Sequence, residues 1–571
     1  MTRQTTAIRA AAFCASLIGA AAPTTLAAKE VILSPPNPYL AQSYNNQTHW
    51  NDAASDSTNI AVPRGSYEVT PQSFLIVPNE GVGLPHYSDR VGGTEIHWYW
   101  AGHSLRKLKV DDFKFVEIDR LDMRTALPNY QPVTAEQRLE QATAAQKFLD
   151  DRDEQGLLAY MKAQPNRMLT ATSDQAIDGS IYSLLTRDDA FIGANARKVF
   201  RIEQVEPENA MSRMKLAREV TLPPSLFDND KVKAATRLGG DSLFGMGMSF
   251  NGYLVVNTLG GKVVTLNRES LDVIDVYSVE GRDEVFLNSF ATSEEADGGA
   301  VYVASNQNMY RLVVDKAGKI RADEASGGWK AAYERGRRFN SVKIADGTGS
   351  TPTLMGFGPG EDKLVVITDG AEKMHLVAMW RDKIPDGWRA KPGVPSSRIV
   401  DMSEVNPDAE LGSVQSEQSV SVFDGYAFVV NNIPTKEEPF LAHDGYYVNM
   451  LNGATRPPAR GVAMLKWDSR RHAWNTLWTR NDVGSVSVVP MISGGSRMAI
   501  FDGYYADRLN ERYQIGLDLD TGKTALQIRT GSSPLFNGMY APVKCDSEGR
   551  LLYGMAFGLV LMDTSRMKRS D

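Results

Sequence analysis

Cysteine and histidine are scarce in this sequence. Its 571 residues include two cysteines, Cys14 and Cys545, and seven histidines. So few thiols exclude a disulfide framework and a thiolate-rich metal site, because both need several cysteines at close spacing. Vicinal-cysteine redox chemistry and the Cys-x-x-Cys-His attachment of haem are excluded for the same reason. The stability of the chain must therefore come from its hydrophobic core.

Several sequence patterns of common protein classes are also missing. The formal net charge is −7, and lysine and arginine do not cluster, which argues against nucleic acid as a partner. No apolar run approaches the roughly 20 residues of a transmembrane helix, so we expect no transmembrane segment. The Gly-x-Ser-x-Gly elbow of α/β-hydrolases and the phosphate-binding P-loop are absent as well.

The N-terminus has the three parts of a secretory signal peptide. Arg3 and Arg9 give it a positive start, residues 10–22 form a short apolar run, and small residues surround Ala27 and Ala28. This order is typical of a cleaved export signal, and the alternative is a buried N-terminal helix. We predict a signal peptide over 1–28 and one mature domain over 29–571, periplasmic or secreted.

What the sequence does contain is glycine, 48 residues, together with a recurring pair of apolar strands joined by a short polar turn. The first clear pair is 252–257 with 262–266. Short antiparallel strands at a spacing near the 40–50 residues of a blade predict an all-β fold, a seven- or eight-bladed β-propeller. The other clear pairs are 300–304 with 309–315, 363–368 with 375–380, 426–430 with 462–467, 497–501 with 513–518 and 551–554 with 559–563; two weaker pairs are 95–100 with 105–108 and 181–185 with 199–202.

Two segments interrupt the strand pattern. Residues 134–164 are predicted to be helical, since Thr134 and Gln137 match a capping box and Pro165 ends the run. This helical insert either packs on the side of the propeller or forms a lid. Residues 431–460 form a long loop insert rich in Pro, Tyr and Asn, and such loops are often functional.

One turn resembles a known propeller motif. Residues 516–526 resemble the blade motif of the quinoprotein (PQQ-dependent) dehydrogenases, with Asp520, Thr521 and Gly522 at the turn. Leu526 stands where that motif has a tryptophan. The resemblance implies the fold, whereas the missing tryptophan and the missing cysteine pair disfavour PQQ as a cofactor.

A second resemblance is to the NHL, gluconolactonase and strictosidine-synthase propellers. In these propellers an Asn precedes an Asp-Gly pair that leads into an apolar strand. Residues 286–291 followed by 297–303 are similar to this order, and residues 339–341 and 535–538 repeat its first half. The resemblance implies oxygen ligands at the starts of innermost strands around Ca²⁺ or another divalent metal. We expect the ligands to be Asn288, Glu417 and Asn537.

The starts of the inner strands also supply candidates for catalysis and substrate binding, because polar residues converge there from different blades. Glu417 and His97 are the catalytic candidates. The alternative for these side chains is strand capping, and for His97 it is aromatic packing between blades. The candidates for substrate binding are Asp241, Thr351, Gln418, His443 and Tyr446.

The sequence thus favours a propeller that binds a small molecule at its channel mouth, as a metal-assisted hydrolase of the lactonase or esterase type. A non-catalytic scaffold of the cell envelope is the alternative. A quinone-dependent oxidoreductase is a third hypothesis, against which Leu526 and the missing cysteine pair count. Protein partners are not indicated by any motif.

Overall fold

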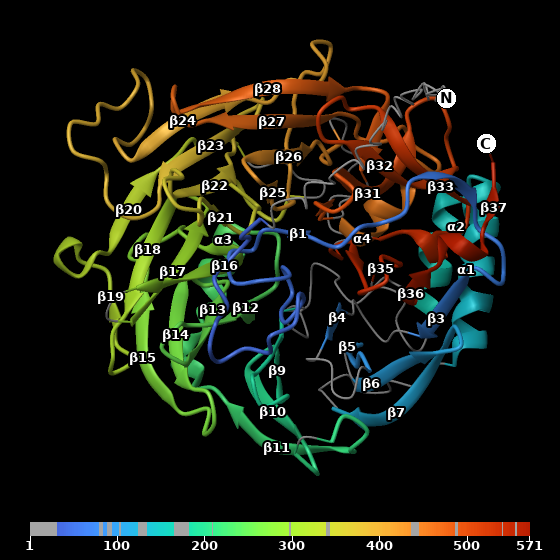
Figure 1. Ribbon diagram of the computed structural model, residues 1–571, viewed down its shortest axis with the longest axis horizontal. Helices are drawn as coiled ribbons and strands as arrows, with labels where there is room; N and C mark the ends of the chain where they lie inside the picture. The colour runs from blue at the N-terminus through green and yellow to red at the C-terminus, as the bar shows by residue number, and fades with distance from the viewer. Residues whose placement is uncertain are drawn as a thin grey trace, which may run out of the picture.

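The computed structural model describes residues 31–78, 84–87, 94–101, 104–123, 134–164, 182–207, 209–295, 298–337, 343–434, 445–485, 489–538, 541–553 and 557–570. The predicted signal peptide therefore lies outside the described residues. Within them the strands group into eight sheets that follow one another around a ring (Figure 1). In most of these sheets the first strand lies nearest the centre of the ring and the last lies at the rim. The predicted all-β propeller is confirmed by this arrangement.

Apart from strands that the two ends of the chain add, the strands of each sheet are consecutive in sequence and mostly antiparallel, as hairpin connections require. The first four sheets contain β4 (Leu84–Tyr87), β5 (His97–Trp100), β6 (Ser104–Asp111) and β7 (Lys114–Asp122); β8 (Leu184–Leu185), β9 (Phe191–Asn195), β10 (Lys198–Gln204) and β11 (Met214–Thr221); β12 (Leu243–Met248), β13 (Tyr253–Thr258), β14 (Lys262–Asn267) and β15 (Val273–Ser278); and β16 (Phe286–Glu295), β17 (Gly298–Ser305), β18 (Asn308–Val314), β19 (Ile320–Arg321) and β20 (Trp329–Ala332).

The other four sheets continue the ring. They contain β21 (Thr353–Met355), β22 (Leu364–Thr368), β23 (His375–Trp380) and β24 (Ile399–Glu404); β25 (Ser421–Phe423), β26 (Tyr426–Val430), β27 (Val462–Asp468) and β28 (Ala473–Arg480); β29 (Val483–Ser485), β30 (Met491–Ser493), β31 (Met498–Tyr505), β32 (Arg512–Asp518) and β33 (Thr524–Gly531); and β34 (Lys544–Cys545), β35 (Leu551–Tyr553) and β36 (Gly558–Met562).

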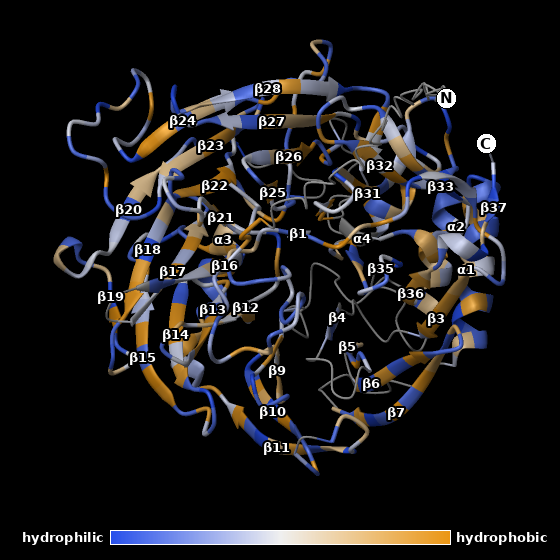
Figure 2. Ribbon diagram, in the orientation of Figure 1, coloured by the Kyte–Doolittle hydropathy of each residue, from blue (hydrophilic) through white to orange (hydrophobic). Residues whose placement is uncertain are grey.

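All six clear strand pairs of the sequence are adjacent strands in these sheets. The weaker pair 181–185 with 199–202 was wrong in one respect, because β9 lies between its two members and pairs with both. The middle strands are buried on both faces against neighbouring sheets, so they are continuous apolar runs in the sequence. Polar residues concentrate on outer strands such as β11 (Figure 2).

The two ends of the chain close the ring together. Strand β3 (Phe74–Pro78) joins β36 as the outermost strand of the last sheet. Strand β2 (Gly65–Glu68) runs parallel to β33, and β37 (Lys568–Arg569) pairs with β2. A buried cluster that includes Val77, Tyr99 and Leu559 then joins the last sheet to the first. The strand β3, from the N-terminal part of the chain, thus completes the last blade.

An N-terminal segment, residues 37–62, crosses the first strands of several sheets, and we call it the inner segment. Its short strand β1 (Ser57–Thr58) pairs in parallel with β30. The inner segment fills hydrogen-bonding positions that the first strands would otherwise leave unpaired, which stabilises them. The backbone bonds run from Thr292 N to Asp52 O (2.8 Å), Leu354 N to Ala53 O (2.8 Å), Val422 N to Ser55 O (2.9 Å) and Ile492 N to Asp56 O (3.0 Å).

The predicted helical insert is confirmed as two helices, α1 (Ala135–Asp150) and α2 (Glu154–Ala163). The side chain of Thr134 and that of Gln137 form the capping box. Ala145 and Leu149 of α1 pack into the cluster between the last two sheets. The insert therefore stands at the side of the ring, beside β3 and β36 (Figure 1), and not over its centre.

The 431–460 insert was predicted to be a long loop. The structure differs, because the helix α4 (Gly445–Leu451) lies within it. Its residues Tyr447, Met450 and Leu451 are buried in the same cluster as α1, so apolar packing orders this segment. The remaining short elements are α3 (Asn229–Ala235) and the 3₁₀ turns η1 (Pro224–Leu226), η2 (Glu324–Ser326), η4 (Pro534–Phe536) and η5 (Thr564–Arg566). Over the described ranges, no helix is long and apolar enough to cross a membrane.

Candidate functional site

A histidine of the inner segment lies between a carboxylate and a hydroxyl at the centre of the ring. His49 Nδ1 lies 2.9 Å from both carboxylate oxygens of Asp56, and His49 Nε2 lies 3.1 Å from Thr351 Oγ1. All three residues are at most 6% exposed. An ionised carboxylate only accepts hydrogen bonds, so Nδ1 carries the proton and Nε2 is left as an acceptor for the Thr351 hydroxyl.

The three residues reach this position from distant parts of the chain. His49 and Asp56 belong to the inner segment, whereas Thr351 precedes β21, the first strand of its sheet. Burial raises the pKa of the Asp56 carboxyl, and His49 beside it counteracts that shift. The backbone N–H of Thr351 donates to Ser419 Oγ (3.1 Å), which fixes the main chain that carries the hydroxyl. The arrangement of hydroxyl, imidazole and carboxylate is that of an activated nucleophile.

Tyr182 and Asn288 extend this line of polar groups. The Tyr182 ring lies 5.7 Å from the His49 ring, and its hydroxyl bonds to Asn288 Oδ1. The Asn288 amide N–H in turn donates to the carbonyl of Gly349. Burial raises the pKa of the Tyr182 hydroxyl well above its ordinary value, so Tyr182 is a neutral hydrogen-bond donor here.

Glu417 lies against the same glycine from the other side. A Cβ atom placed on Gly349 would stand 2.6 Å from the Glu417 carboxyl carbon, so glycine is the residue that leaves room for the carboxylate. Glu417 is buried, and burial raises its pKa to about 7 although Lys343 and Arg237 lower it. Its Oε1 has no hydrogen-bond partner. A buried carboxyl with a pKa near neutrality is typical of functional sites.

Lys343 is a buried cation whose charge acts on the Glu417 carboxyl. Its ammonium donates to the carbonyl of Gly347 (2.6 Å) and is fully buried. Burial lowers the pKa of Lys343, while the Glu417 carboxylate acts in the opposite direction. We call this connected set the central network: Asp56, His49, Thr351, Tyr182, Asn288, Glu417 and Lys343.

Three of the predicted residues, Asn288, Glu417 and Thr351, therefore lie together in the central network. Asn288 and Glu417 approach the same glycine, and Thr351 follows that glycine by two residues. Gln418 takes part through its carbonyl, which accepts from Ser350 Oγ (2.9 Å). Sequence analysis placed these residues correctly at the inner ends of first strands.

Other predicted residues have different surroundings. Asp241 accepts from the backbone N–H groups of Asp228 (2.7 Å) and Gly260 (2.8 Å), so it holds the connection from α3 to β12. Tyr446 falls in α4, and His443 lies outside the described residues.

His97 is packed among aromatic rings. Its ring lies 4.7 Å from that of Tyr87 and 6.3 Å from that of Phe115, and Glu95 stands 3.5 Å from its Nε2. Tyr87 and Phe115 belong to the same sheet as His97, so these contacts give His97 an aromatic packing role within that sheet. The histidine of the central network is His49 instead.

The predicted metal ligands do not fit a shared cation in this arrangement. Asn288 Oδ1 accepts from Tyr182 and from the Ser289 N–H (2.9 Å), so both of its lone pairs are in use. Asn537 donates to the carbonyl of Asn449 in α4 (3.3 Å). Among the described ranges, no three His, Cys, Asp or Glu side chains gather as a metal site. No chemical step is therefore assigned to a metal.

Sequence reasoning missed His49 and Asp56. The two residues lie seven positions apart in a segment without regular structure, and Thr351 is 302 residues from His49. No local spacing links a histidine and a hydroxyl at that separation. The density of polar residues between 45 and 58, unusual for a segment that becomes buried, was the one available signal.

A closed ring of mostly antiparallel sheets, with polar residues meeting at the starts of its inner strands, defines the class: the protein is a β-propeller. No family model matches the chain. An uncharacterized protein of Archaeoglobus fulgidus is 28% identical over 343 residues, and the match covers 56% of this chain and 60% of that relative, less than two thirds of its length.

A quinohemoprotein alcohol dehydrogenase, ADHIIG, from Pseudomonas putida HK5 is 10% identical with a TM-score of 0.47, over 91% of this chain and 80% of its own. A europium-containing methanol dehydrogenase is 8% identical with a TM-score of 0.45, over 93% and 98%. BamB from Moraxella catarrhalis is 11% identical with a TM-score of 0.34, over 65% and 78%. These similarities concern the fold alone.

Proposed function

We propose that this β-propeller is a small-molecule hydrolase whose nucleophile is the Thr351 hydroxyl. The observation that carries the proposal is the line Thr351, His49 and Asp56, with 3.1 Å and 2.9 Å between successive polar atoms. A hydroxyl within reach of a base that a carboxylate orients is the arrangement of nucleophilic acyl transfer. Esters and lactones are the substrates that this chemistry fits.

The proposed reaction has two stages. Thr351 Oγ1 attacks the carbonyl carbon of the ester or lactone while its proton passes to His49 Nε2, and Asp56 holds the Nδ1 proton. The bond from the carbonyl carbon to the alcohol oxygen breaks, and His49 returns the proton to that oxygen. A water molecule then attacks the threonyl ester by the same route, which releases the acid and restores the hydroxyl.

Glu417 supplies a further group for binding. Its pKa of about 7 means that about half of the carboxyls carry a proton at neutral pH. A protonated carboxyl can donate a hydrogen bond from Oε1, the oxygen without a partner, to an oxygen of the ligand. Gly349 leaves space beside it, because a side chain there would collide with the carboxylate.

The test combines an activity assay with covalent labelling. The purified chain is assayed with p-nitrophenyl acetate, p-nitrophenyl butyrate and δ-valerolactone, and it is treated with an alkyl fluorophosphonate. We expect hydrolysis, and a phosphonyl adduct on the peptide that contains Thr351. Thr351→Val and His49→Asn should lower kcat by on the order of 10²-fold or more, because each removes the nucleophile or its base, whereas Thr351→Ser should keep part of the activity.

Thr353→Val is the matched control. Thr353 is also a buried threonine that contacts the inner segment, but its hydroxyl bonds only to the carbonyls of Ala54 (3.1 Å) and Val420 (2.9 Å). This variant should lose stability and keep its kcat. If no substrate is hydrolysed, no adduct forms, and Thr351→Val behaves like Thr353→Val, the hydrolase proposal is refuted and the non-catalytic scaffold takes its place.

The proposed compartment is outside the cytoplasm, periplasmic or secreted. The support is the N-terminal pattern alone, with Arg3 and Arg9 before the apolar run 10–22 and small residues near Ala28. The single remaining cysteine, Cys545, is buried and unpaired, so folding after export needs no disulfide bond within the chain.

A further inference from the structure

A second group of buried polar side chains lies on one face of the sheet that contains β31 and β32. Asp502 of β31 is paired directly with Gln514 of β32 in the antiparallel ladder; Tyr504 follows Asp502 by two residues, and Arg512 precedes Gln514 by two. Because side chains alternate along a strand, all four point to the same face. All four are fully buried.

Helix α4 and the turn after η4 enclose this face. Arg512 Nη2 donates to the carbonyl of Met450 in α4 (3.4 Å), and the Gly538 N–H donates to Asp502 Oδ2. Asn449, the residue before Met450, accepts from Asn537 through its carbonyl and is itself fully buried. We call these five residues the α4 cluster: Asn449, Asp502, Tyr504, Arg512 and Gln514.

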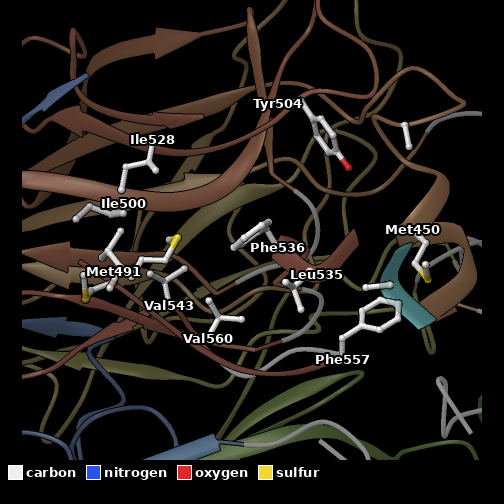
Figure 3. Close-up of a cluster of buried hydrophobic side chains, with 14 of the residues drawn as sticks. Met450, Met491, Ile500, Tyr504, Ile528, Leu535, Phe536, Val543, Phe557 and Val560 are labelled. Carbon is white, nitrogen blue, oxygen red and sulfur yellow. The ribbon is translucent and has the colours of Figure 1, made fainter. Parts of the chain in front are cut away.

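Apolar residues surround the α4 cluster. Figure 3 shows Tyr504 at the edge of the hydrophobic cluster, with its hydroxyl directed away from Ile500 and Ile528 and toward the side on which Met450 lies. Leu535 and Phe536 belong to the same cluster. The polar groups are therefore separated from bulk water by a packed apolar wall.

The α4 cluster has more hydrogen-bonding atoms than the protein satisfies. Buried polar atoms nearly always have a partner, so several unpartnered ones in one place point to a bound molecule. The atoms without a partner are Asp502 Oδ1, both side-chain polar atoms of Gln514 and both of Asn449, whereas the Tyr504 side chain and the Arg512 guanidinium interact with each other.

The chemistry of these atoms identifies the class of ligand. Asp502 and Arg512 attract each other, and burial raises the pKa of Asp502 to about 7, so this carboxyl can both donate and accept hydrogen bonds near neutral pH. A cation would leave the N–H groups of Gln514 and Asn449 without an acceptor. Donors and acceptors occur together, and a hydroxyl group both donates and accepts.

We propose that the α4 cluster is a binding site for a neutral, hydroxyl-rich small molecule of the sugar class. Hydroxyl groups of the sugar take the free acceptors of Asp502, Gln514 and Asn449 and the free amide N–H groups of Gln514 and Asn449. This site is separate in its residues from the central network and does not depend on the hydrolase proposal.

An open groove adjoins the proposed site. It has a volume of about 730 Å³ and is lined by polar residues of α1, of the β31–β32 turn and of the end of β33. Glu511, which precedes Arg512, and Thr530 of β33 are among them. Thr530 Oγ1 is buried without a partner. None of the five residues of the α4 cluster is in the lining of this groove, but Gly531 in the lining is paired with Arg512.

The experiment measures sugar binding by isothermal titration calorimetry on the full chain. The probes are D-glucose, N-acetyl-D-glucosamine, D-galactose and maltose, each at up to 20-fold excess over the highest protein concentration. We expect one of them to bind at one site per chain. Gln514→Leu and Asp502→Asn should weaken that binding at least tenfold, because each removes or alters hydrogen bonds to hydroxyl groups.

Gln527→Leu is the matched control, since Gln527 is also a glutamine of this sheet. Its side chain accepts from the Tyr505 hydroxyl (2.8 Å), and its strand position places it on the opposite face from Gln514. This variant should bind the sugar like the unmodified chain. Absence of binding by all four sugars, or equal binding by the unmodified chain, Gln514→Leu and Asp502→Asn, overturns the proposal and leaves water as the occupant.

Discussion

The buried carboxyl of Glu417 makes the stability of the fold depend on pH in a defined window. Its pKa is about 7 in the folded chain, against an ordinary value of 4.5. Between these two pH values the folded chain keeps a proton that the unfolded chain has lost. Stability contributed by this group is therefore present below pH 4.5 and is lost as the pH rises toward 7.

The size of the effect follows from the two pKa values. A tenfold difference in proton affinity corresponds to about 1.4 kcal/mol, so the rise from 4.5 to about 7 corresponds to roughly 3 kcal/mol. Glu417→Gln is neutral at every pH and has no such loss. The free energy of unfolding of Glu417→Gln, relative to the unmodified chain, should therefore increase by roughly 3 kcal/mol from pH 4.5 to pH 7.

Urea unfolding followed by tryptophan fluorescence at half-unit pH steps measures this difference. The change with pH is the predicted quantity, since the lost attraction to Lys343 adds an offset to the absolute stability of the variant. Glu410→Gln is the control, because the Glu410 side chain is 84% exposed, and it should follow the unmodified chain at every pH. A difference between Glu417→Gln and the unmodified chain that stays constant from pH 4.5 to pH 7 would refute the reasoning.

Three other predictions use the same unfolding assay or direct sequencing. Burial lowers the pKa of Lys544 to about 7, so above that pH the unfolded chain binds a proton that the folded chain lacks. Lys544→Met should therefore lose stability relative to the unmodified chain by about 1.4 kcal/mol per pH unit from pH 7 to pH 9. A stability difference that does not change with pH would contradict this prediction. Gly453 has φ +80° and would place a Cβ 2.2 Å from the Tyr504 ring, so Gly453→Ala should lower the free energy of unfolding by about 1–3 kcal/mol or more, while Gly412→Ala, with nothing near its Cβ position, should change it little. N-terminal sequencing of the exported protein should start after Ala28, and an intact N-terminus in an exported fraction would contradict the signal-peptide prediction.

Strand order was readable from the sequence because the buried middle strands are continuous apolar runs. The runs 252–257 and 262–266 became β13 and β14 with the expected hairpin pairing. The helical insert was readable as well, since a capping box at Thr134 is a local signal that acts within one helical turn. The helix α4 was missed, because its stability depends on packing Tyr447 and Met450 into a distant cluster and not on its own sequence.

The residues of the candidate site also divide into those that the sequence could predict and those that it could not. Asn288, Thr351 and Glu417 could be predicted because each precedes or begins a first strand, and strand starts converge in a ring of sheets. His97 was preferred over His49 since it stands in an obvious strand. Only the folded chain shows that His97 is surrounded by Tyr87 and Phe115.

The sequence by itself determined the sheets of the ring, the helical insert and the exclusion of thiol chemistry, because strand periodicity, capping and composition are local properties. Tertiary structure alone decided which histidine meets a hydroxyl, and that two sets of polar residues are buried, one at the centre and one under α4. The reason is physical: His49 and Thr351 come together only when the inner segment, residues 37–62, pairs with first strands hundreds of residues away.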